Sequence, residues 1–197
     1  MKIFLCCLCI IFEFVSCVNS QTNPFQKIEY ASFDVNSYRT KTKDTAYVGV
    51  YYLISNKGLM VINNQDDYHN THTYYSFQLT QEELKKLHSI FAQTHKMKSY
   101  LGSTNLDENS LYAGAYDFFR VTYADGNVDS LCIIPPFMTT DFQKAYNFLD
   151  SVIYIREGRK EIEKFDIPII FKRSLKSCYF NSSYLPEIKT LPSFKSQ

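Results

Sequence analysis

The sequence predicts an α+β domain in which a mainly antiparallel sheet has two helices packed on it. The chain has 197 residues, with 16 Tyr, 16 Phe and no Trp, and aromatic and β-branched residues favour strands. Short apolar segments are joined by tight turns, which is typical of hairpins. Two longer segments show helical periodicity behind capping residues. A chain of this length can form one domain with a substantial core.

Four segments in the first half of the chain have strand character. Residues 46–54 are the strongest candidate, because both faces of the strand would be apolar, as in a strand covered on two sides. The Asn-Lys-Gly sequence at residues 56–58 predicts a tight turn into a second strand at residues 59–62. Residues 73–79 alternate as a third strand, and residues 28–35 have patchier strand character.

Capping residues mark the start of both predicted helices. Thr80 and Glu83 form a capping box, in which each side chain can bond the backbone of the other residue. Thr140 is the expected cap of the second helix, with Gln143 at the matching position. The expected buried stripes are Leu84, Leu87, Ile90 and Phe91 in the first helix, and Phe142, Ala145, Leu149, Val152 and Ile153 in the second.

A hairpin is predicted between the two helices, and a last strand after them. Residues 116–123 and 128–134 flank an Asp-Gly turn, which supplies the positive φ angles of a hairpin. Residues 167–171 are interpreted as an edge strand, because Pro168 cannot donate a hydrogen bond to a neighbouring strand. The chain after Ser174 is loosely patterned.

The first residues have the pattern of an export signal. Lys2 supplies a positive charge and residues 3–15 form a short apolar segment that contains Glu13. A helix needs about 20 apolar residues to cross a ~30 Å hydrocarbon layer, so this segment is too short to remain as a membrane span. The predicted organisation is an export signal (1–16), a lipidated cysteine and polar tether (17–27), one α+β domain (28–173) and a loosely structured tail (174–197).

The end of the leader resembles a known processing motif. Residues 14–17, Phe-Val-Ser-Cys, are similar to the lipobox of bacterial lipoproteins, and short leaders that end in Ser-Cys resemble those of Bacteroidota lipoproteins. The resemblance implies acyl chains on Cys17 that hold the protein at a membrane of the cell envelope, since stable anchoring takes two or more chains. Cleavage after Ser20, before Gln21, is the competing interpretation and would release a soluble protein.

Two further resemblances concern the exported part of the chain. Residues 59–62, 78–84 and 121–126 resemble segments of small uncharacterised α/β domains in bacterial lipoproteins. Those domains have no assigned activity, so the resemblance implies no site residue. The Asp-Thr-Ala sequence at residues 44–46 resembles the O-glycan acceptor motif of Bacteroidota exported proteins, which implies a glycan on Thr45.

One polar segment, residues 66–72, contains a possible set of metal ligands. Two histidines three residues apart can share a metal on a helix or in a folded loop, whereas on a strand their rings point to opposite faces. A solvated loop between two strands is the alternative interpretation, because Asp and Asn favour turns. The candidate ligands are Asp66, Asp67, His69 and His72.

Cys132 and Cys178 are the only cysteines after Cys17. In an oxidising compartment a disulfide between them would close a loop of about 45 residues, worth about 4 kcal/mol in the chain-entropy model. Two free thiols are the alternative. A nucleophilic cysteine would need an activating base, and no histidine is close to either residue in the sequence.

Composition excludes several classes of function. A formal net charge of +1 with scattered Lys and Arg does not suit nucleic acid. The six glycines form no phosphate-binding loop or nucleophile elbow, and no cofactor is expected. The sequence therefore predicts a non-catalytic envelope lipoprotein that binds a partner, expected to be an envelope protein. The alternatives are a metal-dependent hydrolase that uses residues 66–72, and a soluble secreted inhibitor or immunity-type protein.

Overall fold

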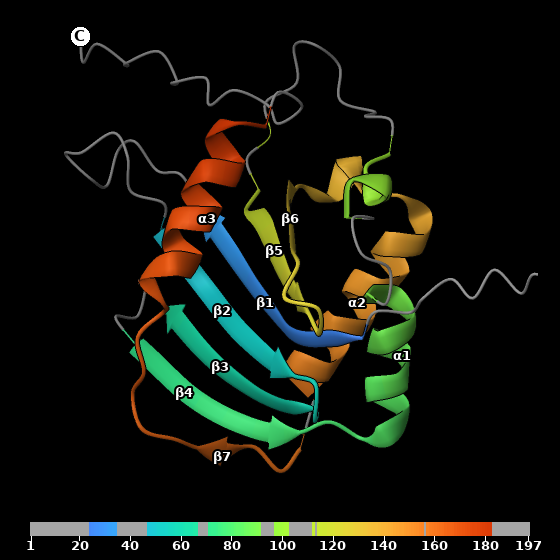
Figure 1. Ribbon diagram of the computed structural model, residues 1–197. Coiled ribbons are helices and arrows are strands. Elements are labelled where there is room, and N and C mark those ends of the chain that lie inside the picture. The colour runs from blue at the N-terminus through green and yellow to red at the C-terminus, as the bar shows by residue number, and fades with distance from the viewer. Residues whose placement is uncertain are drawn as a thin grey trace, which may run out of the picture.

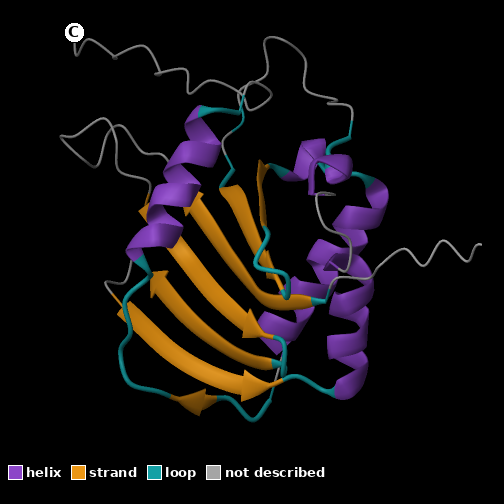
Figure 2. Cartoon of the chain, in the orientation of Figure 1, coloured by secondary structure: helices purple, strands orange, loops and turns teal. Residues whose placement is uncertain are grey.

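The computed structural model describes residues 24–34, 47–66, 71–91, 97–102, 112, 114–155 and 157–182. In these residues the chain forms one antiparallel seven-stranded sheet and three α-helices (Figures 1 and 2). The strands are β1 (Phe25–Asp34), β2 (Tyr47–Ser55), β3 (Leu59–Asp66), β4 (Thr71–Gln78), β5 (Tyr116–Tyr123), β6 (Val128–Ile133) and β7 (Lys160–Glu161). The helices are α1 (Gln81–Phe91), α2 (Thr140–Ile155) and α3 (Ile169–Phe180), with 3₁₀ turns η1 (Met97–Tyr100) and η2 (Pro135–Phe137).

Strand β1 joins the two halves of the sheet. The strand order is β6-β5-β1-β2-β3-β4-β7, so β1 pairs on one side with β2 and on the other with β5. Both partners are antiparallel to β1, and the hairpins β2–β3–β4 and β5–β6 extend the sheet outward from it. The pairing of β1 with β5 bridges residues about ninety positions apart in the chain, because Glu29 is the register partner of Arg120.

Helices cover both faces of the sheet (Figure 1). On one face, Phe142 of α2 packs against Phe119 of β5 and Phe91 of α1, with ring centroids 5.2 and 6.4 Å apart. On the other face, Phe171 of α3 packs against Tyr51 of β2 and Phe118 of β5, at 4.9 and 5.1 Å. The sheet is therefore the middle layer of three. This arrangement explains why strand residues of both faces are buried.

Local signals in the sequence correctly predicted much of this structure. The capping box is present: the Thr80 amide donates to Glu83 Oε2 at 2.6 Å, and the Glu83 amide donates to Thr80 Oγ1 at 3.2 Å. Both predicted tight turns contain a glycine with positive φ, 80° at Gly58 and 86° at Gly126. At these two positions a side chain would strain the backbone. The mixed, mainly antiparallel fold is confirmed.

The C-terminal part of the fold differs from the prediction. The structure has three α-helices rather than two, because α3 replaces the edge strand predicted at residues 167–171 and extends into the segment predicted as loosely structured from Ser174. A short apolar run does not distinguish a strand from a buried helix by its periodicity alone. Pro168 precedes the helix, where a missing N–H costs nothing.

Two smaller predictions also need correction. Strand β1 begins at Phe25, inside the segment predicted as the tether. The cap of α2 is Thr139 rather than Thr140, since the Phe142 amide donates to Thr139 Oγ1 at 3.4 Å. Gln143 does not complete a capping box, because its side-chain amide donates to Asn147 instead.

A buried ion pair lies between β1 and β5, on the face that carries α3. Arg120 Nη1 donates to Glu29 Oε2 at 2.5 Å, and the Glu29 side chain is fully buried. The Tyr51 hydroxyl donates to the other carboxylate oxygen at 3.2 Å, and Lys27 Nζ lies 3.2 Å from Oε2. A buried charge requires such partners, because burial removes its hydration. The carboxylate is therefore held by three side chains from three strands.

A second buried carboxyl group lies on the opposite face of the sheet. The Tyr30 hydroxyl donates to Asp117 Oδ1 at 2.5 Å, and Asp117 is 2% exposed. Burial raises the pKa of Asp117 from 3.8 to about 7, the Tyr30 hydrogen bond opposes the shift, and the negative charge of Asp150 adds to it. Asp117 is thus a carboxyl group that exchanges its proton near neutral pH.

Replacing Arg120→Leu is expected to lower the free energy of unfolding by about 3–5 kcal/mol, because it leaves the buried Glu29 carboxylate without its main cation. Urea denaturation measures this. Adding Glu29→Leu to Arg120→Leu should recover part of the loss, since both buried charges are then gone. The matched control is Lys144→Ala, which breaks an exposed pair with Asp141 and should change stability by no more than about 0.5 kcal/mol. Equal losses of stability in Arg120→Leu and Lys144→Ala would contradict this account.

The raised pKa of Asp117 gives a second prediction. The pKa of Asp117 is near its ordinary value of 3.8 in the unfolded chain and near 7 in the folded protein, so the free energy of unfolding falls as pH rises from about 4 to 7 and then levels off. Asp117→Asn removes this contribution, up to roughly 4 kcal/mol. Urea denaturation should show that the free energy of unfolding falls less between pH 5 and pH 8 in the variant than in the wild type. The exposed control Asp141→Asn should keep the wild-type difference.

Candidate functional site

The fold brings Cys132 and Cys178 together. Cys132 lies on β6 and is fully buried, and Cys178 is a half-buried residue of α3. The two thiols are hydrogen-bonded to each other and are not bridged. Cys178 approaches β6 because it shares the buried side of α3 with Phe171 and Leu175, at a spacing of four and seven residues. The structure thus places together the two residues for which the sequence predicted either a disulfide or two thiols.

The two thiols differ in acidity. The hydrogen bond from the Cys132 thiol is the main cause that lowers the pKa of Cys178 from 9.0 to about 7; burial opposes it, and the Ser130 and Ser182 side chains contribute. Burial strongly raises the pKa of Cys132. Cys178 is therefore the more acidic of the two thiols and ionises first as pH rises. A thiolate is the nucleophilic form of cysteine, so Cys178 is the reactive member.

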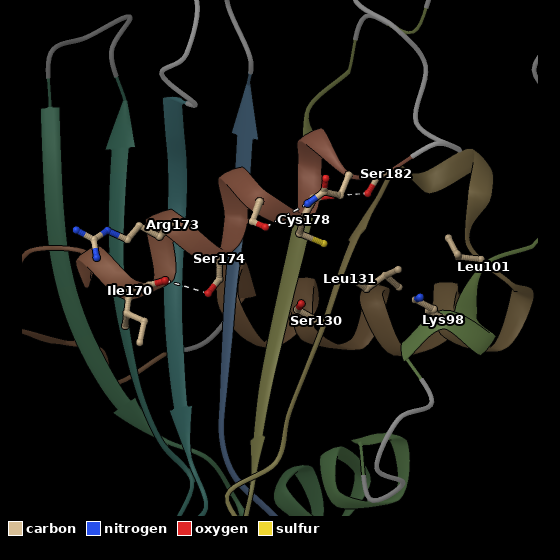
Figure 3. Close-up of a pocket in the computed structure, with 11 residues that line it drawn as sticks. Lys98, Leu101, Ser130, Leu131, Ile170, Arg173, Ser174, Cys178 and Ser182 are labelled. Atoms are coloured by element: carbon tan, nitrogen blue, oxygen red, sulfur yellow. Dashed lines mark hydrogen bonds between the residues drawn. The ribbon is translucent and has the colours of Figure 1, made fainter.

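Cys178 opens into a groove beside α3, which we call the α3 groove (Figure 3). The groove has a volume of about 680 Å³ and lies between α3 and the two elements β6 and η1. Ligand pockets commonly have volumes of 300–1,000 Å³, so the α3 groove is large enough for a small molecule or a peptide segment. Its lining residues are Lys98, Leu101, Ser130, Leu131, Ile170, Arg173, Ser174, Ser177, Cys178, Asn181 and Ser182.

The lining of the α3 groove combines apolar and polar side chains and carries positive charge. Lys98 of η1 and Arg173 of α3 are exposed and lie well apart, with Cys178 between them in Figure 3. Among the residues that the structure describes, no acidic side chain lines the groove. The remaining polar groups are mainly hydroxyls, which can donate or accept a hydrogen bond. This lining suits a ligand that carries carboxylates or peptide groups.

The candidate metal ligands are only partly described. Asp66 ends β3 and pairs with Thr71, whereas His72 of β4 pairs with Gln65, so Asp66 and His72 are not cross-strand neighbours. His72 lines a separate pocket of about 250 Å³ with Asp166 and neutral and basic side chains. Asp67 and His69 lie outside the described residues. Within the described residues, no three His, Cys, Asp or Glu side chains are grouped to hold a metal ion.

Two other predicted sites, Cys17 and Thr45, also lie outside the described residues. Among the helices that the structure describes, none has both the length and the apolar character needed to cross a membrane. No protein-family model, curated protein or solved structure matches this chain.

Sequence reasoning missed most of the α3 groove. It assigned no helix to residues 97–102, so the contribution of Lys98 was not found, and it treated most of α3 as a tail. One signal was present for α3: Phe171, Leu175 and Cys178 recur at helical spacing. Following that period beyond the apolar run would have placed Cys178 on the buried side of a helix.

The lowered pKa of Cys178 predicts a shifted pH profile for alkylation. The rate constant for reaction of the native protein with iodoacetamide should rise with pH to a plateau, with a midpoint near 7, because only the thiolate reacts. Cys132→Ala removes the side-chain donor that is the main cause of the shift and should move the midpoint upward. Cys178→Ser should remove the rapid alkylation that we assign to Cys178. A wild-type midpoint near 9 would contradict the assigned acidity.

Proposed function

We propose that this protein is a lipoprotein of the bacterial cell envelope, held at the membrane by acyl chains on Cys17, whose domain binds a segment of a partner protein in the α3 groove. The leader supports the first part, because its apolar run ends at a Ser-Cys pair. The polar residues that follow Cys17 would form the tether between the lipid and the domain. In this proposal the α3 groove binds the partner without covalent chemistry on the bound segment.

The start of β1 limits how far the domain can lie from the membrane. β1 begins at Phe25, and a fully extended chain spans at most about 3.5 Å per residue, or about 28 Å for the eight steps from Cys17. A domain on so short a connection stays close to the lipid headgroups. Its partner would therefore be a membrane protein or another protein held in the same layer.

The observation that carries the binding proposal is the chemistry of the α3 groove. Hydroxyl and amide side chains from Ser130, Ser174, Ser177 and Asn181 can pair with the N–H and C=O groups of a peptide. Lys98 and Arg173 are exposed and favour a segment with acidic side chains through complementary charge. Ile170, which is 61% exposed, offers an apolar contact beside them. Together these groups fit an acidic peptide segment.

The proposed membrane anchoring through Cys17 is tested by the mass of the mature N-terminal peptide from the native host. We expect the chain to begin at Cys17 with a diacylglyceryl group, because lipoprotein processing cleaves before the modified cysteine. Cys17→Ala should abolish the acylated form. An unmodified chain that begins at Gln21 would overturn the anchored assignment and favour the soluble secreted alternative.

The binding surface is tested by crosslinking in the native host. A photoreactive amino acid in place of Ser177, inside the α3 groove, should yield a discrete protein adduct that mass spectrometry can identify. The same group in place of Lys144, an exposed residue on α2, is the matched control and should yield none. Adding Arg173→Glu should reduce the Ser177 adduct several-fold if the partner segment is acidic. Adducts of equal yield at both positions would rule out the α3 groove as the binding surface.

A further inference from the structure

Cys132 and Cys178 differ in access as well as in acidity. Cys132 is fully buried, whereas Cys178 lines the α3 groove. A reagent that enters the groove therefore meets Cys178 first, and Cys132 lies behind it within hydrogen-bonding contact. An accessible thiol can attack a disulfide and form a mixed disulfide, and a second thiol beside it can then resolve that mixed disulfide to an internal bridge.

We propose that Cys178 and Cys132 form a thiol–disulfide exchange pair, in which Cys178 takes up one half of a disulfide donor through the α3 groove and Cys132 displaces it. The donor belongs to the class of disulfides that bear carboxylates, since Lys98 and Arg173 line the same groove. The inference rests on the export proposed above only for its setting, because disulfide donors persist in oxidising compartments.

The exchange proceeds in two balanced steps. In the first, the Cys178 thiolate attacks one sulfur of the donor; a Cys178–donor S–S bond forms, the donor S–S bond breaks, and the leaving thiolate takes a proton from water. In the second, the Cys132 sulfur attacks the Cys178 sulfur; a Cys132–Cys178 S–S bond forms, the Cys178–donor S–S bond breaks, and the Cys132 proton passes to the leaving donor thiolate, which departs as a thiol. The two cysteines lose two electrons and two protons in total, and the donor disulfide is reduced to two thiols.

The surroundings of each thiol set the expected rates. The first step draws on an accessible thiolate, since Cys178 ionises near neutral pH. The second step is slower, because Cys132 is buried away from water and its thiolate is disfavoured. A mixed disulfide at Cys178 therefore accumulates before the internal bridge closes. Once closed, the bridge links α3 to β6.

Glutathione disulfide, which carries several carboxylates, is a suitable probe. The reduced full-length mature protein is mixed with it in detergent, quenched with acid at intervals and analysed by intact mass and peptide mapping. We expect a species with one glutathionyl group on Cys178 first, and later a species that lacks two hydrogens and contains the Cys132–Cys178 bridge. Modification of Cys132 first, or an adduct that never converts to the bridge, would overturn the proposal.

Variants separate the two roles. Cys132→Ser should stop at the mixed disulfide, and Cys178→Ser should react at least tenfold more slowly than the wild type. The wild-type time course decides the order of events by itself if either variant fails to fold. Lys98→Glu together with Arg173→Glu, both at exposed positions, should slow capture of glutathione disulfide several-fold and leave the rate with the uncharged hydroxyethyl disulfide unchanged. Equal slowing with both probes would contradict selection of donors by charge.

The assay is independent of the lipid anchor, so it separates this inference from the proposed function. An unmodified N-terminus with normal exchange would overturn the anchored assignment and leave the thiol pair in place. An acylated Cys17 with no exchange would overturn the thiol pair and leave the anchored assignment in place.

Discussion

The Glu29–Arg120 ion pair lies where the two halves of the sheet meet, and both halves depend on the register that it sets. The two residues are cross-strand partners of β1 and β5, and Glu29 is fully buried. A shift of one residue would turn Arg120 to the opposite face of the sheet and leave the carboxylate buried without its cation. The same shift would also turn the apolar side chains of the strand to the wrong face. The ion pair and the hydrophobic pattern therefore favour the same alignment of two strands that are far apart in sequence.

Local chemistry predicted the elements better than it predicted their arrangement. The capping box at Thr80 and the turns at Gly58 and Gly126 follow from short-range rules, and the structure confirms them. Strand β1 was predicted as a patchy segment, since Glu29 interrupts its apolar pattern; its role became clear only with Arg120, about ninety residues later in the chain. No local rule links two strands at that separation.

The candidate site was also hidden by sequence distance. Cys132 and Cys178 were recognised as a possible pair, but their contact depends on α3, which was interpreted as a short strand and a tail. Lys98 was missed because nothing in the sequence around it predicts that η1 lies beside β6. The parts of the α3 groove come from three separate segments of the chain, and tertiary packing alone brings them together.

The resulting architecture is a firmly held sheet with a less firmly held helix that carries the reactive thiol. β1 is hydrogen-bonded to a strand on each side, whereas α3 is the last described element and buries fully only Phe171 and Leu175. Opening α3 breaks the packing of Phe171 and Tyr179 on the sheet but leaves every strand paired, so it should require less free energy than unfolding the sheet.

Native-state hydrogen exchange of the reduced protein tests this claim most directly. The account predicts that amides of β1 and β5 exchange only through global unfolding, while amides of α3 exchange through a separate opening of lower free energy, and that closing the Cys132–Cys178 bridge slows α3 selectively. If α3 and β1 exchange with the same free energy, the helix does not open separately from the sheet and the account is wrong.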